Sequence, residues 1–106
     1  MIEAKFTRKD ADRIVSFEMS GHADFAESGS DIVCAAASVL AINVVNSIDE
    51  LAGYQPIVDM DDGYLFVEIL SDLSDKQIET TDILMNSLYI GLRDIEKEYE
   101  SYIRVK

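Results

Sequence analysis

The sequence predicts an α+β domain in which two long helices cover an antiparallel or mixed sheet. Several short stretches alternate apolar and polar residues, as half-buried strands do. In two longer segments, apolar residues follow at helical spacing after a residue that can cap a helix N-terminus. An Asp-Gly pair between two apolar runs indicates a hairpin. The predicted order is ββαββαβ, and 106 residues with 48% hydrophobic content suit a single domain over residues 1–106.

The first two strands form a predicted hairpin at the start of the chain. Residues 2–7, IEAKFT, alternate three apolar with three polar side chains. A turn is expected at Asp10-Ala11-Asp12, and residues 13–19, RIVSFEM, then return as the second strand.

The first helix is predicted from residue 30 to about residue 52. Ser30 or Asp31 can cap its start, and Gly53 is a suitable stop. Apolar residues occupy most of its circumference, so we expect it to be the central, well-buried helix. Three consecutive alanines, Ala35 to Ala37, allow a neighbouring backbone to approach closely.

The second half of the chain contains a hairpin, a helix and a last strand. QPIVDM and GYLFVEIL are strands joined by Asp61-Asp62-Gly63. Ser74 and Gln77 form a capping box that opens the second long helix. The tail, YIRVK, alternates again and can add a strand. The helix carries one apolar stripe, which we expect to pack on the sheet rather than on a partner helix: Ile78, Thr81, Met85, Leu88, Leu92, Ile95 and Tyr99.

Charge is the most unusual property of the composition. The net charge is -12, and no Lys or Arg occurs from Ile14 to Asp75, although carboxylates occur throughout that span. Such a surface repels nucleic acid and attracts a basic protein or peptide, at a rate that falls as salt rises. The simpler interpretation is that the acidity only keeps the protein in solution.

The sequence also bounds the compartment. No apolar stretch is expected to be long enough to cross a bilayer, because the longest apolar-rich run, Ile32 to Val45, is interrupted by Ser38 and Asn43. The first ten residues lack the apolar block of a signal peptide. A single cysteine cannot form an intrachain disulfide, which favours a reducing compartment.

His22 and Cys34 are the only histidine and the only cysteine, and they are twelve positions apart. A thiolate is favoured by a histidine partner and by a helix N-terminus, and Cys34 is predicted within about one turn of a helix start. The pair is therefore a candidate nucleophile and base. The alternative is that Cys34 is a small buried hydrophobe and that His22 is an ordinary loop residue.

The sequence around the pair resembles the ribosomal-processing cysteine protease family, Prp. The resemblance includes length, acidity and the order of elements, and its motif is GHA, a short loop, and then G-S-DIVCAAAS. The matching positions are Gly21, His22, Ala23, Gly29, Asp31, Ile32, Val33, Cys34, Ala35, Ala36 and Ser38.

The resemblance implies a cytoplasmic bacterial endopeptidase that is a homodimer. The family removes an N-terminal extension from the twenty-seventh protein of the large ribosomal subunit. That extension ends in an apolar, aromatic-containing stretch and is cut before a small residue. Cys34 would be the nucleophile and His22 the general base, and no metal ion or other cofactor is expected. No direct contact with nucleic acid or with a membrane is expected either.

The surrounding residues have expected supporting roles. Backbone N–H groups at the helix start, including that of Cys34, could hold the oxyanion. Asp31 is expected to cap the helix; the alternative is that it orients His22. Ser38 shares the helical face of Cys34 and could bond near the site or back to its own helix. Residues Ala23 to Gly29 could form a lid, or a fixed loop with Phe25 in the core.

Two other functions compete with the protease. The first is a non-enzymatic acidic protein that docks on basic ribosomal proteins, with Cys34 in its core. The second, a thiol redox protein, is disfavoured because there is no second cysteine to resolve an oxidised intermediate.

Overall fold

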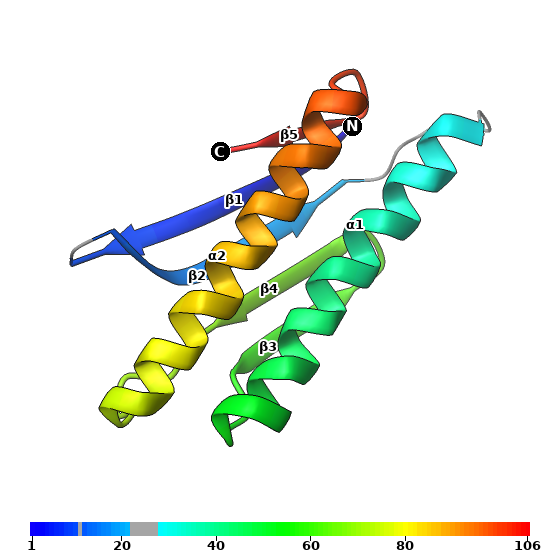
Figure 1. The fold of residues 1–106 in the computed structure, drawn as a ribbon. Coiled ribbons are helices and arrows are strands. Elements are labelled where there is room, and N and C mark those ends of the chain that lie inside the picture. The colour runs from blue at the N-terminus through cyan, green and yellow to red at the C-terminus, as the bar shows by residue number, and fades with distance from the viewer. Residues whose placement is uncertain (11, 22–27) are drawn as a thin grey trace.

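The computed structural model describes residues 1–10, 12–21 and 28–106. The predicted order ββαββαβ is confirmed, and a short π-helical segment, η1, continues the first helix (Figure 1). The elements are β1 (Ile2–Lys9), β2 (Arg13–Ser20), α1 (Ser28–Ser47), η1 (Ile48–Ala52), β3 (Ile57–Asp61), β4 (Tyr64–Glu68), α2 (Asp75–Glu98) and β5 (Ile103–Val105).

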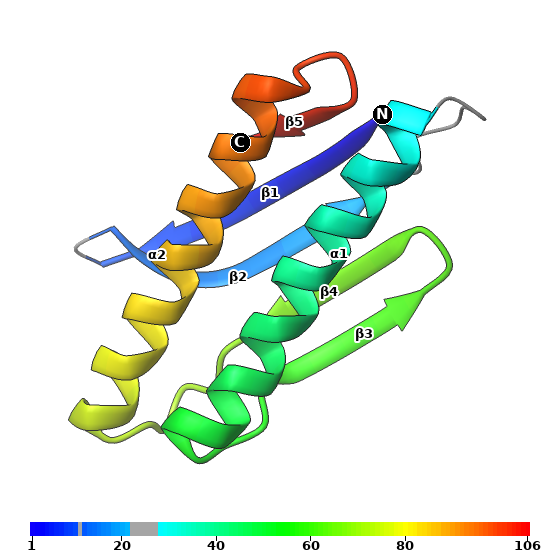
Figure 2. The ribbon, with the colours of Figure 1, turned by 45° about the vertical axis from the view of Figure 1, so that its right-hand side comes forward.

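The five strands form one mixed sheet in the order β3-β4-β2-β1-β5. β1 pairs with β5 in parallel, and the other neighbours are antiparallel. Both long helices run across the same face of the sheet, as the two views of the ribbon show (Figures 1 and 2). The described part of the chain is thus a helix layer on a sheet layer.

The core lies between these two layers. On β1, the alternation of IEAKFT buries Ile2, Ala4 and Phe6, as predicted. The Phe6 ring lies 5.7 Å from that of Phe17 and packs edge-on against Tyr89 of α2. The predicted stripe of α2 is buried at its centre and packs on the sheet. Its buried members are Thr81, Met85, Leu88 and Leu92.

Two predicted helix ends are confirmed, one at Gly53 and one at Ser74. Gly53 has φ +74° and donates its N–H to the Asp49 carbonyl, so it ends η1 as predicted. The Ser74 side chain accepts from the Gln77 N–H and the Gln77 side chain accepts from the Ser74 N–H, which completes the capping box.

The helix α1 corrects two predictions. It is not well buried all round, because only its inner side packs on the sheet and α2, while Val39, Ile42 and several other apolar residues are exposed. The prediction that no stretch is long enough to cross a membrane is also wrong. Residues Ile32–Ala52 have a mean hydropathy of 1.8 over a sufficient length, with 28% buried. Ser38 and Asn43 are uncharged, so they lower the hydropathy without interrupting it.

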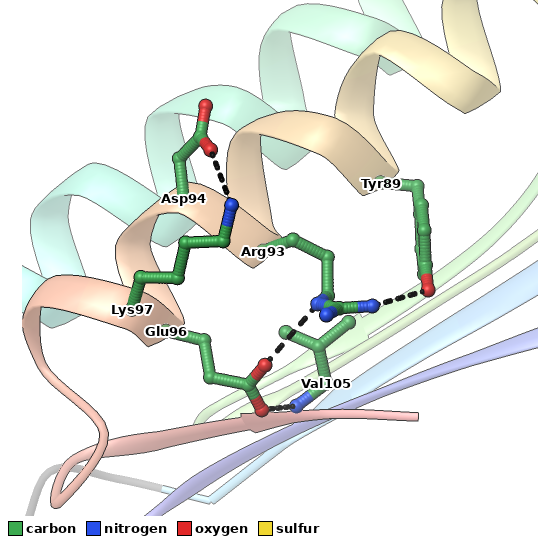
Figure 3. A network of polar contacts seen from close by, with 6 residues as sticks. All are labelled: Tyr89, Arg93, Asp94, Glu96, Lys97 and Val105. Carbon is green, nitrogen blue, oxygen red and sulfur yellow. Dashed lines mark hydrogen bonds and ion pairs between the residues drawn. The ribbon is translucent and has the colours of Figure 1, made fainter.

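A polar network attaches the C-terminal strand to α2 (Figure 3). The Glu96 carboxylate accepts the Val105 N–H at 2.7 Å and pairs with Arg93, which in turn donates to the Tyr89 hydroxyl. The Arg8 guanidinium lies 5.0 Å from the centre of the Tyr89 ring. Because β5 has only three residues, these contacts hold it beside β1 at the sheet edge.

Candidate active site

Cys34 lies on α1 and lines a cavity of about 250 Å³. Its side chain is partly buried and packs against the core. The cavity lies between α1, the start of β1, the end of β2 and the β3–β4 turn. The other lining residues are Ile2, Met19, Gly21, Ser38, Ile42, Met60, Asp61, Asp62, Gly63, Tyr64 and Leu65.

Gly21 joins three chain segments at this cavity. Its φ is +97°, a region that side chains with a Cβ rarely adopt. A Cβ built there would collide with the backbone carbonyl oxygen of Met1. The Gly21 N–H donates to the Gly63 carbonyl at 2.9 Å. A glycine is therefore required where the end of β2 meets the N-terminus and the β3–β4 turn.

His22 lies outside the described residues, and so the predicted contact between His22 and Cys34 stays a prediction. The described residue nearest to it in sequence is Gly21, which lines the same cavity as Cys34. The lid predicted for Ala23 to Gly29 includes residues 23–27, which also lie outside the described part, as does Phe25. Gly29 belongs to α1.

The start of α1 corrects the predicted role of Asp31. The helix begins at Ser28, so Ser30 and Asp31 lie inside its first turns and neither is the N-cap. A carboxylate in the first turns of a helix is still favourable with the helix dipole. The side-chain contacts of Asp31 lie outside what the structure describes, so its other predicted role, orienting His22, stays a prediction.

The same extension moves Cys34 away from the helix end. Cys34 is the seventh residue of α1, about 9 Å from its first residue at 1.5 Å per residue. In a regular helix its N–H is used by the carbonyl four residues earlier. The predictions that this N–H holds the oxyanion and that the dipole activates the thiol therefore do not fit, because both effects belong to the first turn.

Ser38 lines the same cavity one turn after Cys34, which confirms that the two share a helical face. The sequence did not indicate the opposite wall. Asp61 and Asp62 form an acidic rim on the β3–β4 turn, where the Asp62 N–H donates to the Asp61 carboxylate. The Asp-Gly signal predicted the turn, but no local pattern could show that it faces Cys34.

Tyr64 follows this turn and is tied to the sheet by its hydroxyl. It donates to Glu18 at 3.0 Å, on the sheet face away from the helices. Desolvation, and after it the hydrogen bond and charge of Glu18, raise the pKa of Tyr64 above its ordinary value. The phenol is therefore protonated at neutral pH and remains a hydrogen-bond donor that holds β4 on β2.

The comparisons with known proteins address the chemistry of this site. The family model described as cysteine protease Prp matches residues 1–104. The chain belongs to the cysteine protease Prp family. The ribosomal processing cysteine protease Prp of Bacillus subtilis (strain 168) is 36% identical over 99% of this chain and 96% of its own length.

Two solved structures at 30% identity or more share the fold of this chain. The crystal structure of SMU.848 from Streptococcus mutans has a TM-score of 0.88 and 34% identity, covering 100% of this chain and 92% of its own. The essential ribosomal processing protease Prp from S. aureus, in complex with a substrate peptide, has a TM-score of 0.85 and 30% identity, covering 100% and 98%. A second structure of that enzyme contains a covalently linked product peptide.

Membership of the Prp family decides between the functions that the sequence left open. The chain is a cysteine protease. Neither a binding protein with an inert core thiol nor a thiol redox protein accounts for this membership. Cys34 is the one cysteine in the sequence, and the structure places it at the cavity described above.

Proposed function

We propose that this Prp-family protease removes the N-terminal extension of the twenty-seventh protein of the large ribosomal subunit. Cys34 acts as the nucleophile and His22 as the general base. One observation carries the assignment: the cavity that Cys34 lines is also lined by Gly21, the residue bonded to His22. This shared lining supports the assignment of the pair, because Gly21 directly precedes His22 in the sequence.

The reaction uses the thiol in two steps. His22 accepts the thiol proton, and the Cys34 thiolate attacks the scissile carbonyl to form a thioester with the extension. The proton passes to the leaving amine of the mature ribosomal protein. Water then hydrolyses the thioester and releases the extension. The half-exposed position of Cys34 suits this role, because a fully buried thiol could not reach a peptide.

The distribution of charge supports a basic substrate. The span without Lys or Arg includes β3, β4 and α1, so the half of the molecule that carries the Cys34 cavity is acidic. The basic residues lie mainly on β1, β5 and α2 at the other sheet edge. A basic ribosomal protein is attracted to the acidic half, whereas nucleic acid is repelled. This fits an enzyme that acts in the cytoplasm on the precursor itself, without direct contact with nucleic acid or a membrane.

We test the substrate by incubating the purified protein with the precursor carrying its extension. The expected result is a single cut, seen as a shift on a gel and as one new mass whose N-terminal residue is small. The same ribosomal protein without its extension is the control and stays uncut. A precursor that remains intact, while Cys34 is alkylated readily by iodoacetamide, would contradict the substrate assignment.

We also propose that the protein is a homodimer that pairs through the outer surface of its helix layer. Exposed apolar side chains lie on both helices there, including Val39 of α1 and Ile83 and Ile90 of α2. These side chains are 65%, 64% and 60% exposed, and a second copy of the chain would cover them. Such a pairing explains why α1 is apolar around most of its circumference although the sheet covers only one side.

Val39→Lys is expected to shift the sedimentation coefficient from that of a dimer to that of a monomer. A lysine ammonium in an apolar interface loses its hydration without gaining a partner. Ile57→Lys is the matched control, because Ile57 is 50% exposed on β3, away from the helix layer. If Val39→Lys sediments as the wild type does, the helix layer is not the dimer face.

A further inference from the structure

A second cavity lies further along the same side of α1. It measures about 340 Å³ and is lined by Val45, Asn46, Asp49, Gln55, Pro56 and Val58. Cys34, Ser38 and Ile42 line the first cavity at steps of four residues, and Asn46 continues that row into the second. Residues four apart share a helical face, so both cavities lie along one face of α1.

The opposite wall of both cavities is β3. Met60 lines the first cavity and Val58 lines the second. They are two residues apart and pair with Leu65 and Val67, whose side chains are buried under the helix layer. Both therefore lie on the helix side of the sheet. The two cavities follow one another between α1 and β3, and we call them together the α1–β3 groove.

The length of the α1–β3 groove matches a peptide. From Cys34 to Asp49, α1 and the start of η1 together rise about 22 Å, at about 1.5 Å per residue. An extended chain covers that distance with about six or seven residues. A groove that begins at the nucleophile and continues for that distance accommodates the segment of substrate on one side of the scissile bond.

The walls of the groove indicate what kind of segment fits. Met60 is 62% exposed and Val58 is 40% exposed, although both are apolar. β3 is also an edge strand, with β4 as its neighbour in the described sheet. An extended peptide can satisfy the backbone groups of such an edge while its side chains cover the apolar ones. A compact ligand would not satisfy both.

We infer that the α1–β3 groove binds an extended, apolar segment of the substrate that flanks the scissile bond. Val58 is then a specificity-determining residue that touches substrate several residues away from the reacting bond. The inference rests on the proposed function for the identity of the nucleophile, because Cys34 marks where the groove begins.

The test compares two lysine substitutions on neighbouring residues of β3. Val58→Lys places a charge in the groove, whereas Ile57→Lys places it on the opposite face of the sheet at similar exposure. Both are made in a Cys34→Ser background. The probe is a fluorescein-labelled peptide that spans the cleavage site of the precursor, and fluorescence anisotropy gives its Kd.

Val58→Lys is expected to raise the Kd at least about tenfold, since it removes an apolar contact and desolvates a charge, while Ile57→Lys stays within about twofold. Met60→Lys is a second variant, at a more exposed position, in case Val58→Lys lowers the melting temperature. Equal Kd values for Val58→Lys and Ile57→Lys overturn the inference. The inference is also overturned if the Cys34→Ser protein does not bind the peptide, or if affinity falls only together with loss of the dimer.

The same experiments separate this inference from the proposed function. If the wild type cuts the precursor but Val58→Lys and Ile57→Lys bind the peptide equally, only the groove assignment fails. If Val58→Lys binds more weakly but the wild type does not cut the precursor, the proposed function fails and the groove remains a peptide site.

Discussion

Replacing Cys34 with serine is expected to abolish cleavage of the precursor, with a loss on the order of 10⁴-fold or more in kcat. A serine hydroxyl is nearly the size of the thiol but far less acidic, so a site suited to a thiolate does not activate it. Cys34 is only partly buried, so the fold is expected to remain intact. The measurement is a quantitative gel assay, with thermal melting by circular dichroism as the fold control.

Ala35→Ser is the matched control for this substitution. Ala35 is the next residue on α1 and is exposed, so the variant adds a serine to the same helical turn away from the cavity. It is expected to retain cleavage. His22→Ala is expected to match Cys34→Ser in the cleavage assay and also to slow alkylation of Cys34 by iodoacetamide. A well-folded Cys34→Ser that still turns over would refute the assignment of the nucleophile.

Gly21→Ala is expected to lower both stability and activity. The φ of +97° costs a residue with a Cβ about 1–3 kcal/mol, and the added carbon also meets the Met1 carbonyl. For a domain of this size, a loss of 2 kcal/mol lowers Tm by roughly 10 °C. Because Gly21 lines the Cys34 cavity and directly precedes His22, the proposed base, kcat is expected to fall as well.

Gly53→Ala separates backbone strain from the effect on the site. Gly53 also has a positive φ, +74°, but no atom lies within 4 Å of its added Cβ. It follows η1, at the other end of the helix from Cys34. We expect it to cost about 1 kcal/mol of stability with little change in kcat. If Gly21→Ala has the same kcat as Gly53→Ala, Gly21 does not position the proposed catalytic base.

The proposed nucleophile, Cys34, lies on α1 rather than on a loop. α1 packs its inner face on the sheet through Val33, Ala37 and Ala41, which are fully buried. Cys34 follows Val33 directly, so its position is held by the packing of its neighbour. A rigid helix keeps the sulfur at a constant distance from β3, and therefore at one end of the groove where a peptide would lie.

Most of the fold was determined by local signals in the sequence. The alternation in IEAKFT, the Asp-Gly turn, the Ser74–Gln77 capping box and the stop at Gly53 each depend on residues close together in the chain. Local backbone preference and one-sided burial are enough to produce such elements. The sequence also predicted that Cys34 and Ser38 share a face, because helical periodicity requires it.

The tertiary structure decided what no local pattern contains. The parallel pairing of β5 with β1, the position of the Asp61-Asp62 rim opposite Cys34, and the groove between α1 and β3 all join residues that are distant in sequence. Hydropathy showed that α1 is apolar on most sides, but only the packing showed that its outer side is left exposed. The start of α1 at Ser28 was also missed, because several residues there can serve as caps and local capping preference does not rank them.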